Sequence, residues 1–106
     1  MADWISVARV GELADGSYRL VELSGSFVAV YRIGEAYHAI EDVCTHDGGE
    51  LAGGPVEGHT VECIRHGARF DLRSGAALNP PAYTGVEVFP VQVEGGVIYV
   101  RDHRLD

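Results

Sequence analysis

The sequence predicts an all-β protein, and three observations lead to that class. Apolar residues occur in short runs that are rich in β-branched and aromatic side chains, which suit strands. Fourteen glycines among 106 residues separate these runs and indicate tight turns rather than long helices. The runs recur at intervals of roughly 8–12 residues, the spacing typical of a β-sandwich or barrel.

The expected strands follow one another along the chain with turn residues between them. They are residues 4–10, 17–23, 26–33, 36–40, 59–63, 68–72, 86–94 and 97–102. Two-residue hairpin turns are expected at 34–35 and 95–96, where glycines occur. Pro90 interrupts the run around it, which predicts an edge strand or a bulge. A helix of at most one or two turns is expected around 10–16.

Residues 41–58 break the strand pattern. They are polar and glycine-rich with one proline, and a long loop in a compact domain usually carries a site. The total length fits one domain over residues 1–106.

The charge balance limits the classes of partner. Sixteen acidic residues outnumber eight basic ones, all of them arginine, and the net charge is −8. Nucleic-acid binding is not expected, because it depends on neutralising phosphates, whereas docking on a basic partner is favoured. The sequence has no run of 18 apolar residues and no signal-peptide pattern, so we expect a cytoplasmic protein without a membrane segment.

The two cysteines, each followed closely by a histidine, are the candidate site. Cys44-x-His46 is separated by sixteen residues from Cys63-x2-His66. In a reducing compartment two cysteines are more often ligands or free thiols than a disulfide. Thiolate and imidazole ligands suit zinc, copper or iron–sulfur iron, so this set of four predicts a metal site.

Two identities of the metal stay open on the residues alone. A tetrahedral zinc ion accepts two cysteines and two histidines, although Cys-x-His is a tight spacing for two ligands of one ion. A two-iron cluster removes that difficulty, because the two ligands of one loop can bind different irons. Rieske [2Fe–2S] centres have this arrangement, with two histidines in place of two cysteines on one iron.

The whole pattern resembles the Rieske ferredoxins of bacterial ring-hydroxylating dioxygenases. "CTH" and "HGARFDLRSG" resemble their two cluster loops, and "NPPAY" (79–83) resembles the proline loop that covers the cluster. Ile64 departs from the family, where proline is frequent. The resemblance implies a Rieske-like antiparallel β-sandwich with a small cluster-binding subdomain at about 41–83, made of two loops and a covering proline loop.

The resemblance also implies which residues bind the cofactor, one Rieske-type [2Fe–2S] cluster per chain. Cys44 and Cys63 would bind the inner iron, and His46 and His66 the outer iron. No catalytic residues are expected, because the chain would be a one-electron carrier and not an enzyme. As a monomer, it would take electrons from a flavin- or iron–sulfur-dependent reductase and pass them to a terminal oxygenase.

The reduction potential is expected to be low for a Rieske protein. High-potential members carry a serine and a tyrosine whose hydroxyls bond to sulfur, and the matching residues here are Ala68 and Phe70. Neither can donate a hydrogen bond to stabilise the reduced state. Two alternative functions remain: a Rieske-like small subunit of another oxidoreductase, as in nitrite reductase, and a zinc-binding structural module.

Overall fold

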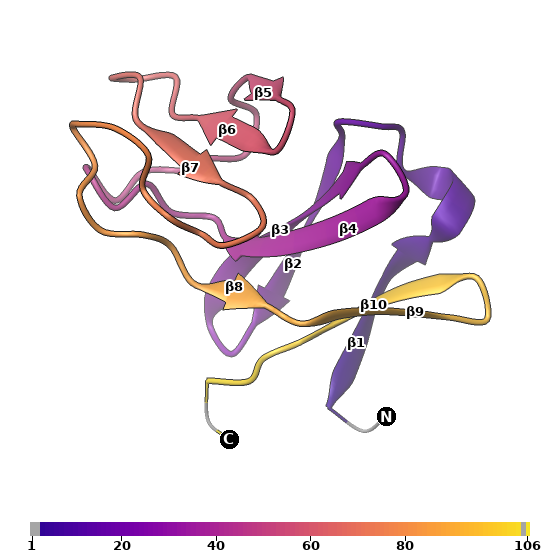
Figure 1. The fold of residues 1–106 in the computed structure, drawn as a ribbon. Helices are drawn as coiled ribbons and strands as arrows, with labels where there is room; N and C mark the ends of the chain where they lie inside the picture. Colours follow the sequence, from indigo (N-terminus) through magenta and orange to yellow (C-terminus); the bar gives the residue numbers. More distant parts are fainter. Residues whose placement is uncertain (1–2, 105) are drawn as a thin grey trace.

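The computed structural model describes residues 3–104 and 106, which form an antiparallel all-β fold with one short 3-10 turn (Figure 1). The predicted fold class is therefore confirmed. The elements are, in chain order, β1 (Trp4–Arg9), η1 (Val10–Glu12), β2 (Tyr18–Leu23), β3 (Ser26–Ile33), β4 (Ala36–Glu41), β5 (Val56–Glu57), β6 (Thr60–Glu62), β7 (Arg69–Asp71), β8 (Val88–Phe89), β9 (Val91–Glu94) and β10 (Val97–Arg101).

The strands form three sheets in the described part of the chain. Their orders are β1-β10-β9, β2-β3-β4-β8 and β5-β6-β7. The first two sheets pack on each other as the base sandwich, and the small third sheet lies over the opposite face of β3 and β4 (Figure 1). Strands β3 and β4 therefore form a middle layer with buried residues on both faces.

Alternation along β3 divides the interior into two cores. Val28 and Val30 face the base sandwich, whereas Ala29 and Tyr31 face the small sheet. The buried residues of the base core are Val7, Ala8, Leu13, Leu23, Val28, Val30, Ala39, Phe89, Ile98 and Val100. Those of the site core are Ala29, Tyr31, Ile40, Cys44, Leu51, Val61, Cys63, Ala68, Phe70, Leu72, Ala82 and Val86.

Most predicted elements are found, with two differences. The hairpins at 34–35 and 95–96 are confirmed, as is the single helical turn after β1. Strand β5 lies inside the segment expected to be a loop, and it pairs with β6. Pro90 separates β8 from β9, which belong to different sheets. Because proline has no N–H to donate, the ladder breaks at the point where the chain changes sheet.

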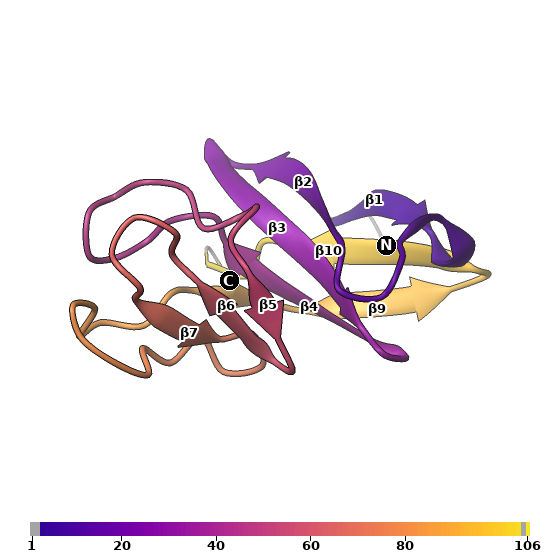
Figure 2. The ribbon, with the colours of Figure 1, turned by 90° about the horizontal axis from the view of Figure 1, so that it is seen from above.

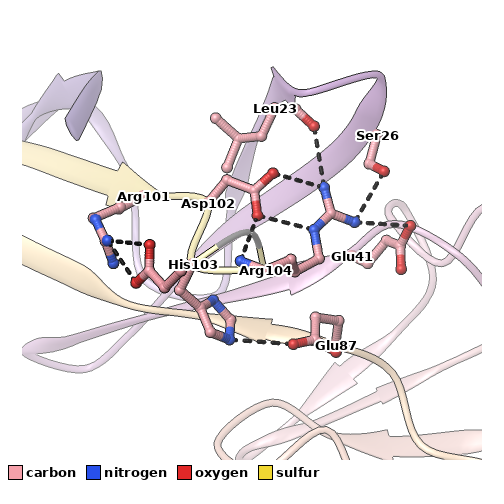
Figure 3. A network of polar contacts seen from close by, with 9 residues as sticks. Leu23, Ser26, Glu41, Glu87, Arg101, Asp102, His103 and Arg104 are labelled. Carbon is pink, nitrogen blue, oxygen red and sulfur yellow. Dashed lines mark hydrogen bonds and ion pairs between the residues drawn. The ribbon is translucent and has the colours of Figure 1, made fainter. Parts of the chain in front are cut away.

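The C-terminal segment is fastened to the base sandwich by a polar network (Figure 3). The Arg104 guanidinium donates to the Asp102 carboxylate at 2.9 Å, to Ser26 Oγ at 3.1 Å and to the Leu23 carbonyl at 3.2 Å. His103 pairs with Glu87 at 3.2 Å.

No helix among residues 3–104 and 106 is long and apolar enough to cross a membrane.

Candidate metal centre

Three loops gather at one end of the molecule, beyond the small sheet. They are the β4–β5 loop (42–55), the β6–β7 loop (63–68) and the β7–β8 loop (72–87). Figures 1 and 2, which view the molecule along perpendicular directions, both show these loops extending side by side from the same end. The first two loops carry the predicted ligands, and the third carries Pro80 and Pro81.

The two ligand loops have the same local geometry. The Gly48 N–H donates to the Cys44 carbonyl at 2.7 Å, and the Gly67 N–H donates to the Cys63 carbonyl at 2.9 Å. In each loop the glycine is four residues after the cysteine and has a positive φ, +77° and +78°. Only glycine takes that conformation without strain, which explains why both Cys-His segments end in one.

The cysteines occupy the buried side of the site. Cys44 and Cys63 are both 0% exposed within the site core. Their sulfurs, together with a carboxylate oxygen of Asp47, all lie within 4.8 Å of one another. Burial raises the pKa of the Cys44 thiol, so a thiolate at this position requires a cation to stabilise it. Paired buried thiols without a disulfide fit iron ligation.

The histidines occupy the exposed side. His46 Nε2 lies 3.0 Å from His66 Nδ1, and the two rings meet edge to face with centroids 4.7 Å apart. The His66 side chain is 58% exposed. The structure thus brings all four predicted side chains to one end of the fold, with thiols inside and imidazoles outside. That the four residues bind iron stays a prediction.

Asp47 is the residue whose importance the sequence reasoning missed. Its Oδ1 accepts the Gly49 N–H at 2.9 Å, which closes a turn within the first ligand loop. The same carboxylate also pairs with Arg65 of the second ligand loop, at 2.6 Å. The available signal was that opposite charges flank the two histidines, at His46-Asp47 and Arg65-His66.

The β7–β8 loop lies against both ligand loops. Asn79 Nδ2 donates to the Gly67 carbonyl at 3.1 Å, and Thr45 Oγ1 donates to the Thr84 carbonyl at 2.5 Å. Ala82 is buried in the site core. Tyr83, at the end of the NPPAY stretch, is 83% exposed. The loop therefore closes the site on one side and presents an aromatic ring to solvent.

A centre of this kind is typical of small metalloproteins that use soft sulfur and nitrogen ligands. Comparison with known proteins makes the class specific: residues 3–90 match the Rieske [2Fe-2S] domain, and the chain belongs to that family. The cofactor is accordingly a Rieske-type [2Fe–2S] cluster, and the alternative of a structural zinc ion is set aside. The donor set agrees, because a Rieske cluster takes two thiolates and two imidazoles.

Three relatives define the neighbourhood more closely. The chain is 35% identical to Ferredoxin CarAc of Metapseudomonas resinovorans, over 95% of both chains. It resembles a chain of the complex of reduced oxygenase and oxidized ferredoxin in carbazole 1,9a-dioxygenase, with 34% identity, a TM-score of 0.89 and coverage of 93% of both chains. The ferredoxin of carbazole 1,9a-dioxygenase from Nocardioides aromaticivorans IC177 is 31% identical with a TM-score of 0.88, over 92% of this chain and 96% of that one. The chain is thus an electron-transfer protein of the ferredoxin type and not itself an enzyme.

Proposed function

We propose that Cys44 and Cys63 bind the inner iron of the cluster and that His46 and His66 bind the outer iron. The observation that carries this assignment is the division of the site into buried thiols and exposed imidazoles. Bound iron offsets the cost of burying thiolates, whereas imidazole ligands tolerate contact with solvent. When bound, the cluster takes up and releases one electron. These residues would hold it with the two histidines on the solvent side of the site.

Replacing one outer ligand tests the assignment. We expect His66→Ala to lose the Rieske absorption spectrum and the EPR signal of the reduced protein, because one iron lacks a ligand. The matched control is His59→Ala, which removes a histidine of the same subdomain outside the four-residue set. A Rieske spectrum that His66→Ala leaves unchanged would refute the assignment.

The acceptor we propose is the terminal oxygenase of a ring-hydroxylating system, and the donor is a flavin- or iron–sulfur-dependent reductase. Support comes from the relative seen in complex with an oxygenase. Two exposed apolar side chains on the loops of this end, Ile64 at 69% exposed and Tyr83 at 83%, give a partner protein something to bury. The net charge of −8 favours rapid encounter with a basic partner surface.

Docking at the loop end that carries His46, His66 and Tyr83, called the tip below, is tested by electron transfer to a terminal oxygenase. The reduced protein is mixed anaerobically with the oxidised oxygenase, and the return of the oxidised ferredoxin absorption gives the rate. Tyr83→Ala should lower the second-order rate at least roughly tenfold, the effect of about 1.4 kcal/mol. Phe27→Ala removes another exposed aromatic ring, on a strand of the base sandwich, and should leave the rate unchanged. Equal losses in both variants would contradict docking at the tip.

We propose that the reduction potential of the cluster is low for a Rieske protein. Ala68 and Phe70 are both 0% exposed and supply no hydroxyl, which supports a potential near the low end of the Rieske range, roughly −150 mV. A midpoint potential above zero would contradict it.

We infer one domain over residues 1–106 that works as a monomer in the cytoplasm and binds no nucleic acid. Gel filtration at several concentrations checks the monomer.

A further inference from the structure

An ion pair joins the two ligand loops directly beside the histidines. Arg65 Nε donates to Asp47 Oδ2 at 2.6 Å, and Arg65 Nη2 donates to Asp47 Oδ1 at 3.0 Å. Two parallel bonds between a guanidinium and a carboxylate fix orientation as well as distance. Asp47 follows His46 and Arg65 precedes His66, so the pair ties the two outer positions of the site together.

The first ligand loop is shaped around this guanidinium. Arg65 Nη2 also donates to the Glu50 carbonyl at 3.0 Å. A Cβ at Gly49 would lie 2.5 Å from the guanidinium carbon, closer than real contacts allow. Gly49 does not have a positive φ, so its turn conformation does not require glycine. A larger residue at this position would push the flexible Arg65 side chain out of its present place.

The two charges of the pair also lie close to the ligands. A carboxylate oxygen of Asp47 is 3.8 Å from His66 Nδ1 and within 4.8 Å of both cysteine sulfurs. Arg65 bonds directly to this carboxylate and follows Cys63 by two residues, so both charges of the pair lie beside the proposed ligands. At such distances each charge acts electrostatically on the site.

No disulfide can brace these loops, because both cysteines of the chain lie inside the site. We propose that Arg65 and Asp47 are positioning residues that clamp the two ligand loops together and set the reduction potential of the cluster with two opposing charges. This inference rests on the proposed ligand set. The clamp slows opening of the loops, the positive charge favours the reduced state, and the negative charge opposes it.

The two halves of the proposal are tested separately on the cluster-loaded protein. Arg65→Gln removes the positive charge and should shift the midpoint potential downward. Asp47→Asn removes the negative charge and should shift it upward, and the double variant should return close to the starting value. A pair that was only structural would loosen the site in the same way in either single variant. Midpoints that move in the same direction, or do not move, overturn the electrostatic half.

Retention of the cluster measures the clamp. The half-life of the visible absorption in the presence of an iron chelator should fall severalfold in all three variants. Arg65→Lys keeps the positive charge but cannot form the two parallel hydrogen bonds to Asp47. The half-life of its cluster should therefore fall, while its midpoint potential stays the same. Arg73→Gln, which breaks an ion pair within the β7–β8 loop region, should change neither. Unchanged half-lives in the Asp47 and Arg65 variants overturn the clamp.

A variant that loses the cluster entirely still leaves the proposal open to refutation. If Arg65→Gln holds no cluster, the midpoint of Asp47→Asn is compared with that of Arg65→Lys, and equal values overturn the charge effect. Circular dichroism checks that each variant remains folded. Failure of the proposed function is distinct, because the unsubstituted protein would then show no Rieske spectrum.

Discussion

The base core and the site core share strands β3 and β4 but differ in the length of the strands that cover them and in what stabilises them. The base core lies between longer strands, and its buried residues are valine, alanine, leucine, isoleucine and one phenylalanine. The site core is covered by strands of two or three residues and by loops, and it contains both cysteines. Regular ladders stabilise the first core, whereas the second depends on turn glycines, one loop-to-loop ion pair and the bound cluster. We infer that the base forms without the cluster and that the site needs it.

Removing an inner ligand is the strongest way to separate the two regions. Cys63→Ser should abolish cluster binding, because a hydroxyl is a poor ligand for iron of this type. We expect amide hydrogen exchange to become fast in the loops 42–55 and 63–68 and to stay slow in β3 and β10. Loss of protection across the whole chain would contradict an independently folding base.

Equal cavities in the two cores should have unequal consequences. Phe70→Ala in the site core and Phe89→Ala in the base core each remove a buried ring, at a cost of about 3–5 kcal/mol in the free energy of unfolding. Only Phe70→Ala should also speed loss of the cluster. Chemical denaturation gives the stabilities, and visible absorption gives the cluster. Similar rates of cluster loss in both variants would remove the distinction.

A hydroxyl added to the site core should change the midpoint potential of the cluster, whereas one added to the base core should not. Ala68→Ser places a donor at the position where high-potential relatives in the Rieske group are expected to have one. A hydrogen bond of about 1 kcal/mol to the reduced site would raise the one-electron midpoint by roughly 40 mV. The control, Ala39→Ser, puts the same group in the base core, where the midpoint should not change. A fall in the Ala68→Ser midpoint would contradict the reasoning.

The smallest expected effect is on the stability of the protein at low pH, through Asp71 at the end of β7. The Arg73 guanidinium lowers the pKa of Asp71 to about 2 in the folded protein. A depressed carboxyl pKa contributes stability above its unfolded pKa of about 4, and this contribution is lost as the pH falls toward 2. In the Cys63→Ser background, Asp71→Asn should lower stability at neutral pH by less than about 1 kcal/mol and flatten its decline below pH of about 4. An unchanged decline would show that Asp71 does not contribute.

The sequence was sufficient for most of the strands, for the hairpins and for the four candidate ligands, because these depend on local periodicity and spacing, but it missed the short strand β5. It did not reveal that Pro90 transfers the chain between sheets, since pairing partners lie far apart along the chain. Tyr83 gave no sign that its ring would face solvent, because exposure depends on how the third loop packs. The Asp47–Arg65 contact was also hidden, as both residues appear as ordinary loop charges until the two loops meet.

Strand β3 has no side that faces only water, and this carries a consequence for the accuracy of folding. A slip of one residue in its pairing would move Val28 and Val30 to the site side and Ala29 and Tyr31 to the base side. Each error would be penalised twice, once by a void and once by an overfilled space. Burial on both faces thus selects one register of β3. Because β4 pairs with β3, the same register fixes where Cys44, just after β4, is placed.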